Sequence, residues 1–388
     1  MATVRMRSKG GAKARSSPRR VWVPLAIIAI ALGLWFVPIA SQQIERDYSN
    51  GVYLALQRAI TPASNALPVA LFDVMLGVVV LLLIARIVMR IRQVRQSPRG
   101  RPWRRTGRAL SWISLDVAAT AALLTIWFSL TWGGNYRRMP LRERLDFDRA
   151  RVTREAAIEM TRTSVRQLNN LHPIAHSRPW PSLDALPATL GGAFADAQHA
   201  LGQPALAVAG RPKSTVMQAW FRWAAIDGMT DPFFLETLVN SDALPIEQPF
   251  IVTHEWSHLA GFAHEAEANF LAWVICQRAD TQAQYSAWLS LYFHLAGGLA
   301  PADRRAIDAD LQDGPRRDMN AIIARYQRSA PQVRVVAWRM YDQYLKANRV
   351  TEGIASYDAV VTLVLGTKFS NDWIPAVKTT NRLSQSTD

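Results

Sequence analysis

The stretch that decides the fold of this 388-residue chain is His254-Glu255-Trp-Ser-His258-Leu-Ala-Gly261-Phe-Ala-His264-Glu-Ala-Glu267-Ala-Asn. Residues four apart share one face of an α-helix, so His254 and His258 can present two imidazoles to one metal ion. Glu255 would lie beside that ion, where a carboxylate can accept a proton from a water molecule. A polar helix with two histidines by chance is the weaker explanation, because three of the chain's seven histidines lie between residues 254 and 264. The stretch therefore predicts a Zn2+ site.

A catalytic zinc ion needs three protein ligands and one open position, and two residues compete for the third place. The segment up to His264 matches H-E-x-x-H-x-x-G-x-x-H, the metzincin pattern, although the later methionines lie in helical contexts rather than in the turn that metzincins need. Glu267 would instead reach back from a second helix, as in gluzincins. Glu265 points about 200° away from Glu267 on a helix, so both cannot be ligands.

The formal charge of +15 is concentrated in two short segments. Residues 1–20 contain seven Lys and Arg and residues 86–108 contain nine Arg, with no acidic residue in either. The rest of the chain has 29 basic and 30 acidic residues and is nearly neutral. Because the basic residues flank apolar runs instead of forming a broad patch, we expect no nucleic-acid partner.

Three apolar runs, at residues 21–40, 67–85 and 110–132, are each long enough to cross a hydrocarbon layer of about 30 Å. Cytoplasmic loops are enriched in Lys and Arg, which places residues 1–20 and 86–108 inside the cell. The part after residue 132 is then extracytoplasmic, and the partner of the spans is the lipid bilayer. The first run is too long for a typical signal peptide, so we expect it to be retained as an anchor.

The single cysteine, Cys276, excludes an intrachain disulfide, which is ordinary for a bacterial extracytoplasmic protein. It lies in an apolar run and is expected to be a buried small side chain. We therefore place the chain in the bacterial inner membrane, with a cytoplasmic N-terminus and a periplasmic C-terminal domain.

The predicted fold is mainly α-helical, with three spans in residues 21–135 and a zincin-like domain with a small β-sheet in residues 136–388. Pro173 to Pro187 is expected to be a loop. Strands are expected at residues 205–209 and 234–240. Gly261 is expected to end the first motif helix. Residues 285–299 are long enough for a fourth span, but their polar residues favour a core helix. The expected helices are at 150–171, 193–202, 251–260, 265–278, 285–299, 301–310, 319–328, 333–348 and 356–365.

The stretch H-E-x-x-H-x-x-G-F-A-x-E-x-E-A-N-F-L resembles an uncharacterised family of bacterial membrane proteins, domain of unknown function 3810. The likeness extends to other segments: Trp132-Gly-Gly-Asn135-Tyr136-Arg137, Pro212-Lys213, Glu236-Thr-Leu-Val-Asn240, Tyr344-Leu-Lys346-Ala-Asn348 and Tyr357-Asp-Ala-Val-Val. A similar Glu-Ala-Asn follows H-E-x-x-H in metallopeptidases of the ImmA/IrrE type, where a downstream Glu completes the site. The resemblance implies that Glu267, rather than His264, is the third ligand.

These observations predict a membrane-anchored zinc metallopeptidase. Zinc lowers the pKa of its bound water, Glu255 takes the proton, and the resulting hydroxide attacks the amide carbonyl of a peptide or protein substrate. Tyr357, His294, Arg316 or Arg317 could stabilise the oxyanion. The segment 236–240 could be an edge strand that aligns the substrate or a purely structural strand. The alternative is a non-enzymatic membrane protein with a structural or degenerate metal site.

Two acidic residues, Asp73 and Asp116, lie inside the second and third predicted spans. Each is about six residues from the end of its span, but from opposite sides of the membrane, so a direct pair is not expected. A structural role is the default expectation for both. The region before the motif, residues 241–258, contains acidic residues and prolines and no long apolar run, which excludes a protease site within a span.

Overall fold

The structure is a computed structural model, and it describes residues 19–96, 102–348, 359–370 and 372–378. The chain packs as two compact units. One consists of the described residues up to Val37 together with Val79–Trp127, and the other of Pro38–Val78 and the chain from Phe128 onward. Residues 38–78, which the sequence assigned to the membrane part, therefore pack with the C-terminal part.

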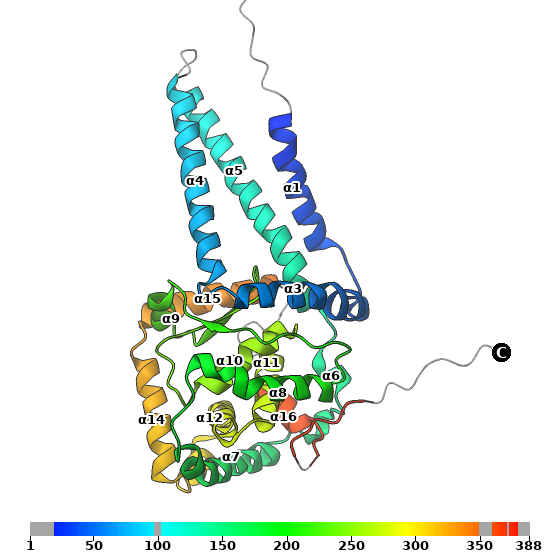
Figure 1. Ribbon diagram of the computed structural model, residues 1–388, viewed down its shortest axis with the longest axis vertical. Coiled ribbons are helices and arrows are strands. Elements are labelled where there is room, and N and C mark those ends of the chain that lie inside the picture. Colours follow the sequence, from blue (N-terminus) through cyan, green and yellow to red (C-terminus); the bar gives the residue numbers. More distant parts are fainter. Residues whose placement is uncertain (1–18, 97–101, 349–358, 371, 379–388) are drawn as a thin grey trace, which may run out of the picture. The chain divides into compact units, whose positions relative to one another are not determined.

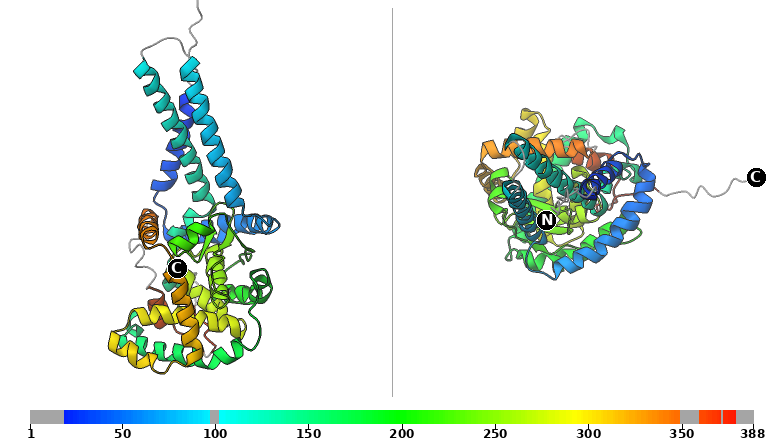
Figure 2. Two further views of the ribbon diagram at one scale, coloured as in Figure 1. Left: turned by 90° about the vertical axis from the view of Figure 1, so that its left-hand side faces the viewer. Right: turned by 90° about the horizontal axis from the view of Figure 1, so that it is seen from above.

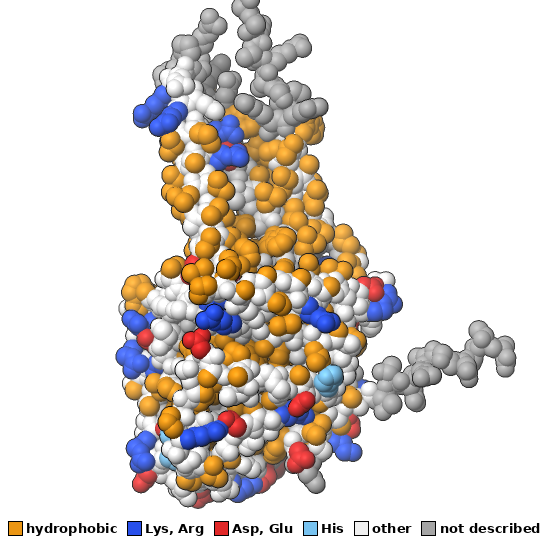
Figure 3. Space-filling view, in the orientation of Figure 1, with side chains coloured by type: hydrophobic (Ala, Val, Ile, Leu, Met, Phe, Trp, Pro, Cys, Tyr) orange, Lys and Arg blue, Asp and Glu red, His pale blue; other side chains and the backbone are white. Residues whose placement is uncertain are grey.

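The first unit is made of long apolar helices: α1 (Arg19–Phe36), most of α4 (Leu71–Gln96) and most of α5 (Pro102–Thr131). Their apolar side chains are largely exposed, and Figure 3 shows hydrophobic groups gathered over these helices. The segments Leu71–Gln93 and Ala109–Thr131 are long and apolar enough to cross a membrane. Val21–Phe36 and Ser41–Asn65 would count as a third span only as a pair bent by 108°. Two or three helices could thus span a bilayer, in agreement with the expectation of a membrane protein.

The two acidic residues of the spans have separate partners, as expected. Within the first unit, the Asp116 carboxylate accepts from the Arg90 guanidinium at 2.8 Å. Asp73, near the start of α4 in the second unit, accepts from Thr215 Oγ1 at 2.6 Å and from the Val216 amide at 2.8 Å. These contacts account for both carboxylates as structural groups.

The second unit is largely helical, and α11 lies in its core with nearly all of its residues buried. Figure 1 shows α8, α10, α12 and α16 around α11, and Figure 2 shows the same elements from two other directions. The helices of this unit are α2 (Ser41–Gln43), a π-helix (Ile44–Tyr53), α3 (Leu54–Asn65), α6 (Leu141–Arg144), α7 (Arg154–Ala175), α8 (Leu186–Ala200), α9 (Gln218–Ala224), α10 (Gln248–Leu259), α11 (Glu265–Gln277), α12 (Thr281–Gly297), α13 (Pro301–Asp308), α14 (Asp313–Gln327), α15 (Pro331–Ala347) and α16 (Ala359–Gly366), with short 3-10 turns at Gly133–Arg137, Arg149–Arg151 and Leu183–Ala185.

Most predicted helices of this unit are confirmed within a few residues, and α12 is a buried core helix as expected. The predicted loop from Pro173 to Pro187 is shorter, because Pro173 lies inside the last turn of α7 and α8 begins at Leu186. The predicted strand at 205–209 is irregular backbone. The start of the last predicted helix, residues 356–358, lies outside the described residues.

A three-stranded sheet has the order β1-β3-β2, with β1 (Pro212–Lys213), β2 (Gly228–Asp231) and β3 (Glu236–Val239). β1 pairs parallel to β3, and β2 pairs antiparallel to β3 with Met229 opposite Leu238. The predicted strand at 234–240 is present as β3, but it is fully buried rather than half-buried. Of the two alternatives for residues 236–240, the edge strand is wrong, because β3 is the central strand of the sheet. The strand at the edge beside α10 is β2.

Candidate metal centre

The helix α10 presents the two histidines of the motif on one face, one turn apart. Pro249 in its first turn suits a helix start, because proline lacks the amide that would there be unpaired. The rings of His254 and His258 lie with centroids 4.7 Å apart and nearly perpendicular. Gly261 ends the helix with a positive φ of 85°, as the sequence predicted. The expected pairing of the two imidazoles is thus present in the fold.

The carboxylate that completes this group belongs to Glu265, the first residue of α11. Its Oε2 lies 3.2 Å from His254 Nε2, and its Oε1 lies 3.7 Å from His258 Nε2. The three side chains bring one ligand atom each to within 4.8 Å of one another. Two imidazoles and one carboxylate are a zinc ligand set that leaves a coordination position open.

Glu267 and His264, the two candidates that the sequence offered for the third ligand, contact other groups in the structure. Glu267 Oε1 accepts from the amide of Leu141, the first residue of α6, at 2.6 Å, so this carboxylate fixes the start of that helix. His264 precedes α11 and its ring lies edge-on to Tyr136, with centroids 6.2 Å apart. The physical reason is the tight turn after α10, which brings the first residue of α11, rather than the third, against the histidines.

The ring of His258 is oriented by a backbone group. Its Nδ1 lies 2.7 Å from the Phe262 carbonyl oxygen, to which it donates, so that Nε2 is left to face Glu265. The ring of Trp132 stands edge-on to it at 5.8 Å between centroids. Such an outer hydrogen bond selects the tautomer that binds metal through Nε2.

Strand β2 holds Glu255 on the neighbouring face of α10. Thr230 Oγ1 donates to Glu255 Oε2 at 2.8 Å and also contacts the Glu255 carbonyl oxygen at 2.9 Å. Gly228 fits closely against this carboxylate, because a Cβ at that position would lie 2.6 Å from Glu255 Oε1. The backbone of β2 and one hydroxyl therefore set the position of this side chain.

The charges of the centre depend on one another. Burial raises the pKa of Glu255, although His254 and His258 oppose this shift. Burial by itself would lower the pKa of His258, but the Glu265 carboxylate outweighs it and raises that pKa to about 9. Burial would likewise raise the pKa of Glu265, and the two histidines instead hold it well below its usual value. The Glu265 carboxylate and the His258 imidazole therefore each favour the charged form of the other.

A tyrosine that the sequence did not indicate also reaches the centre. The hydroxyl of Tyr341, on α15, donates to Glu265 Oε1. Of the oxyanion candidates named from the sequence, Arg316 has other partners: its guanidinium donates to the carbonyl oxygens of Asp308 and Leu311, both at 2.8 Å. Tyr357 lies outside the described residues. Tyr341 is separated from Glu265 by 76 residues, so no local pattern could have revealed it.

The donor set fits a zinc ion. Among the described residues, the buried Glu265 Oε2 has the ion-pair contact with His254 Nε2 at 3.2 Å but no partner with full hydrogen-bond geometry. The buried His254 Nδ1 likewise has no hydrogen-bond partner among the described residues. Buried polar atoms are normally hydrogen-bonded, and an ion among these atoms would give Glu265 Oε2 a direct bond in place of this contact. His254, His258 and Glu265 would hold it.

Comparison with known proteins gives a family but no described activity. No curated protein and no solved structure matches this chain. The family model "Protein of unknown function (DUF3810)" matches residues 48–365, a segment that includes α10, α11, the sheet and Tyr341. Because this match covers most of the chain, the protein belongs to the DUF3810 family.

Proposed function

We propose that this protein is a membrane-anchored zinc metallopeptidase, with His254, His258 and Glu265 as zinc ligands and Glu255 as the proton acceptor. The observation that carries the proposal is the convergence of these four side chains on one helix pair. Glu265 takes the place that the sequence comparison had given to Glu267. A purely structural zinc site does not need a glutamate such as Glu255 beside it, and such sites are normally closed by four ligands.

Zinc held by these side chains would supply Lewis acidity and a water molecule of lowered pKa. Glu255 is suited to accept a proton from that water, because Thr230 fixes one of its oxygens and burial raises its pKa. The Tyr341 hydroxyl, beside Glu265, is a candidate donor to the developing oxyanion.

The strand β2 offers a place for an extended peptide substrate. It is one of the two edge strands of the sheet, and its Thr230 side chain touches Glu255. Within the described part of the chain, β2 pairs with no strand other than β3, so a peptide could pair with its outer edge and be held by main-chain hydrogen bonds. This role replaces the one that the sequence suggested for residues 236–240.

The experiment that tests this proposal is hydrolysis of a mixed library of quenched fluorescent peptides by the full chain in mild detergent. We expect cleavage that stops on treatment with a zinc chelator and returns on addition of Zn2+. Absence of cleavage by the zinc-loaded chain would contradict the proposal.

One observation favours a second candidate, a non-enzymatic membrane protein with a structural metal site. Glu255, His258 and Glu265 are only 3%, 7% and 4% exposed, so a substrate has little room to reach them in this conformation. A chain that retains zinc but cleaves no peptide would support this second candidate.

We further propose that the second unit lies outside the cytoplasm, because the Arg-rich segment 86–108 between two apolar helices is typical of a cytoplasmic loop. Cys276 is fully buried, so an introduced cysteine would be the accessible thiol. We expect a membrane-impermeant maleimide to label Asn320→Cys, on the exposed face of α14, in intact spheroplasts. Gln93→Cys, in the last turn of α4, should be labelled only after lysis, and the reverse result would contradict this topology.

A further inference from the structure

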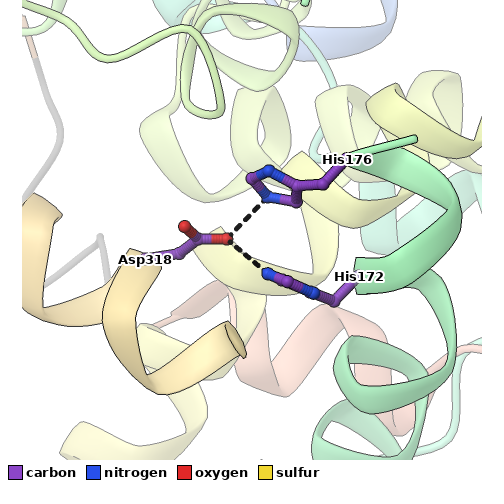
Figure 4. A group of neighbouring side chains, drawn as sticks. All are labelled: His172, His176 and Asp318. Carbon is purple, nitrogen blue, oxygen red and sulfur yellow. Dashed lines mark hydrogen bonds and ion pairs between the residues drawn. The ribbon is translucent and has the colours of Figure 1, made fainter. Parts of the chain in front are cut away.

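A second group of metal-ligating side chains lies at the surface of the second unit, between α7 and α14. His172 lies in the last turn of α7, His176 directly follows this helix, and Asp318 comes from α14. Figure 4 shows both imidazoles directed at the same carboxylate oxygen. His176 Nε2 lies 2.9 Å and His172 Nε2 lies 3.6 Å from Asp318 Oδ2. We propose that these three side chains form a second site for a divalent transition-metal ion, with Zn2+ as the ion that fits best.

The distances suit tetrahedral coordination. Zinc bonds to nitrogen and oxygen of about 2.0–2.1 Å place neighbouring ligand atoms about 3.3 Å apart. The two measured distances lie on either side of this value, and all three ligand atoms are within 4.8 Å of one another. The two rings are stacked with centroids 4.3 Å apart, so both can present Nε2 to the same point. Small shifts of exposed side chains would complete the geometry.

The ligands are held in place by buried neighbours on α12. Gln282 Nε2 donates to the carbonyl oxygens of Ala175, Pro179 and Arg178, at 3.0, 3.2 and 3.3 Å, and thereby fixes the turn that carries His176. The Tyr285 hydroxyl donates to Asp318 Oδ2 at 2.6 Å. Such supporting hydrogen bonds orient ligands before an ion arrives, and metal sites with oriented ligands bind more tightly.

Exposure distinguishes this site from the centre on α10. The side chains of His172, His176 and Asp318 are 19%, 32% and 16% exposed, so water and a free ion can reach them directly. The fourth coordination position would face solvent. An ion here would join α7 to α14, with α12 beneath through Tyr285, and would stabilise this part of the fold. Because these ligands are more exposed than those of the α10 centre, we expect the ion to exchange more readily than one bound by His254, His258 and Glu265.

The test is zinc binding by the full chain in mild detergent, measured by equilibrium dialysis and elemental analysis with ZnCl2 alone. The variant His254→Ala/His258→Ala, which lacks the α10 centre, should still bind about one zinc ion, as expected for one remaining set of three ligands. Adding His176→Asn and Asp318→Asn should remove it. The matched controls are Asp313→Asn, the same change at an exposed position of α14, and His199→Asn, an exposed histidine on α8; both should leave binding unchanged.

The wild-type chain gives a second readout that does not depend on the folding of the His254→Ala/His258→Ala variant. After removal of metal, titration of the wild-type chain with ZnCl2 should load about two zinc ions. The substitution Asp318→Asn alone should lower the affinity for the more weakly bound ion by at least about tenfold. Zinc uptake that is the same in wild type and in a His176→Asn/Asp318→Asn variant with the α10 centre intact would overturn the proposal, whether one or two ions are bound. Peptide hydrolysis is not used as a readout, so failure of this proposal is separate from failure of the proposed activity.

Discussion

Replacement of Glu255 by glutamine is expected to lower kcat for peptide hydrolysis by roughly 10²–10⁴-fold, the usual contribution of a general base. An amide of the same shape can still accept from Thr230 Oγ1, which now holds the carboxylate at 2.8 Å, but it cannot take up a proton. Glu255 is not one of the three proposed zinc ligands, so bound zinc should be unchanged.

The measurement is initial-rate kinetics on a cleaved peptide, with zinc content determined on the same sample. Glu159→Gln, an exposed change on α7 at a residue paired with Arg166, is the matched control and should keep wild-type activity. Wild-type kcat in Glu255→Gln would contradict the role that we assign to this residue.

Replacement of Lys213 by alanine is expected to destabilise the second unit by about 3–5 kcal/mol, because it leaves a buried carboxylate without its counter-ion. Lys213 Nζ lies 2.6 Å from Glu236 Oε1, and both side chains are almost completely inaccessible. Glu236 also accepts from the amides of Leu71 and Phe72, at 3.1 and 3.0 Å. This pair therefore joins β1 and β3 to the first turn of α4.

Unfolding of the full chain by urea in mild detergent, followed by tryptophan fluorescence, measures this effect, since Trp256, Trp273 and Trp288 are buried in the core. The control is Lys346→Ala on α15, which breaks a more exposed ion pair with Asp342 and should cost less than about 1 kcal/mol. An equal effect of the two substitutions would show that the buried pair does not have the importance proposed here.

The sequence predicted the parts of the centre that depend on local spacing. Two histidines four residues apart defined α10, and Gly261 marked its end. The carboxylate proposed as third ligand depends on how the chain turns between α10 and α11, because a difference of two residues changes which carboxylate faces the histidines. The backbone from Gly261 to His264 sets this rotation, and the Leu141 amide, which binds Glu267, comes from a distant segment. Neither is visible in a motif.

Other features were present in the sequence but needed tertiary structure to interpret. Lys213 and Glu236 belong to the segments that resemble the family, and the fold explains them as a buried ion pair. His172 and His176 have the same four-residue spacing as the motif histidines, a signal that could have indicated the second group. Their partner Asp318 lies 142 residues after His176, so only packing of α14 against α7 brings them together.

The most direct test of the central claim is bound zinc per chain in wild type, Glu265→Gln and Glu267→Gln, measured on the full chain in mild detergent. Each change removes one negative charge from α11, and only Glu265 contacts His254 and His258. We predict that Glu265→Gln loses about one equivalent of zinc relative to wild type, as expected for loss of one of three protein ligands, whereas Glu267→Gln loses none. Unchanged zinc in Glu265→Gln together with loss in Glu267→Gln would contradict this account of the centre.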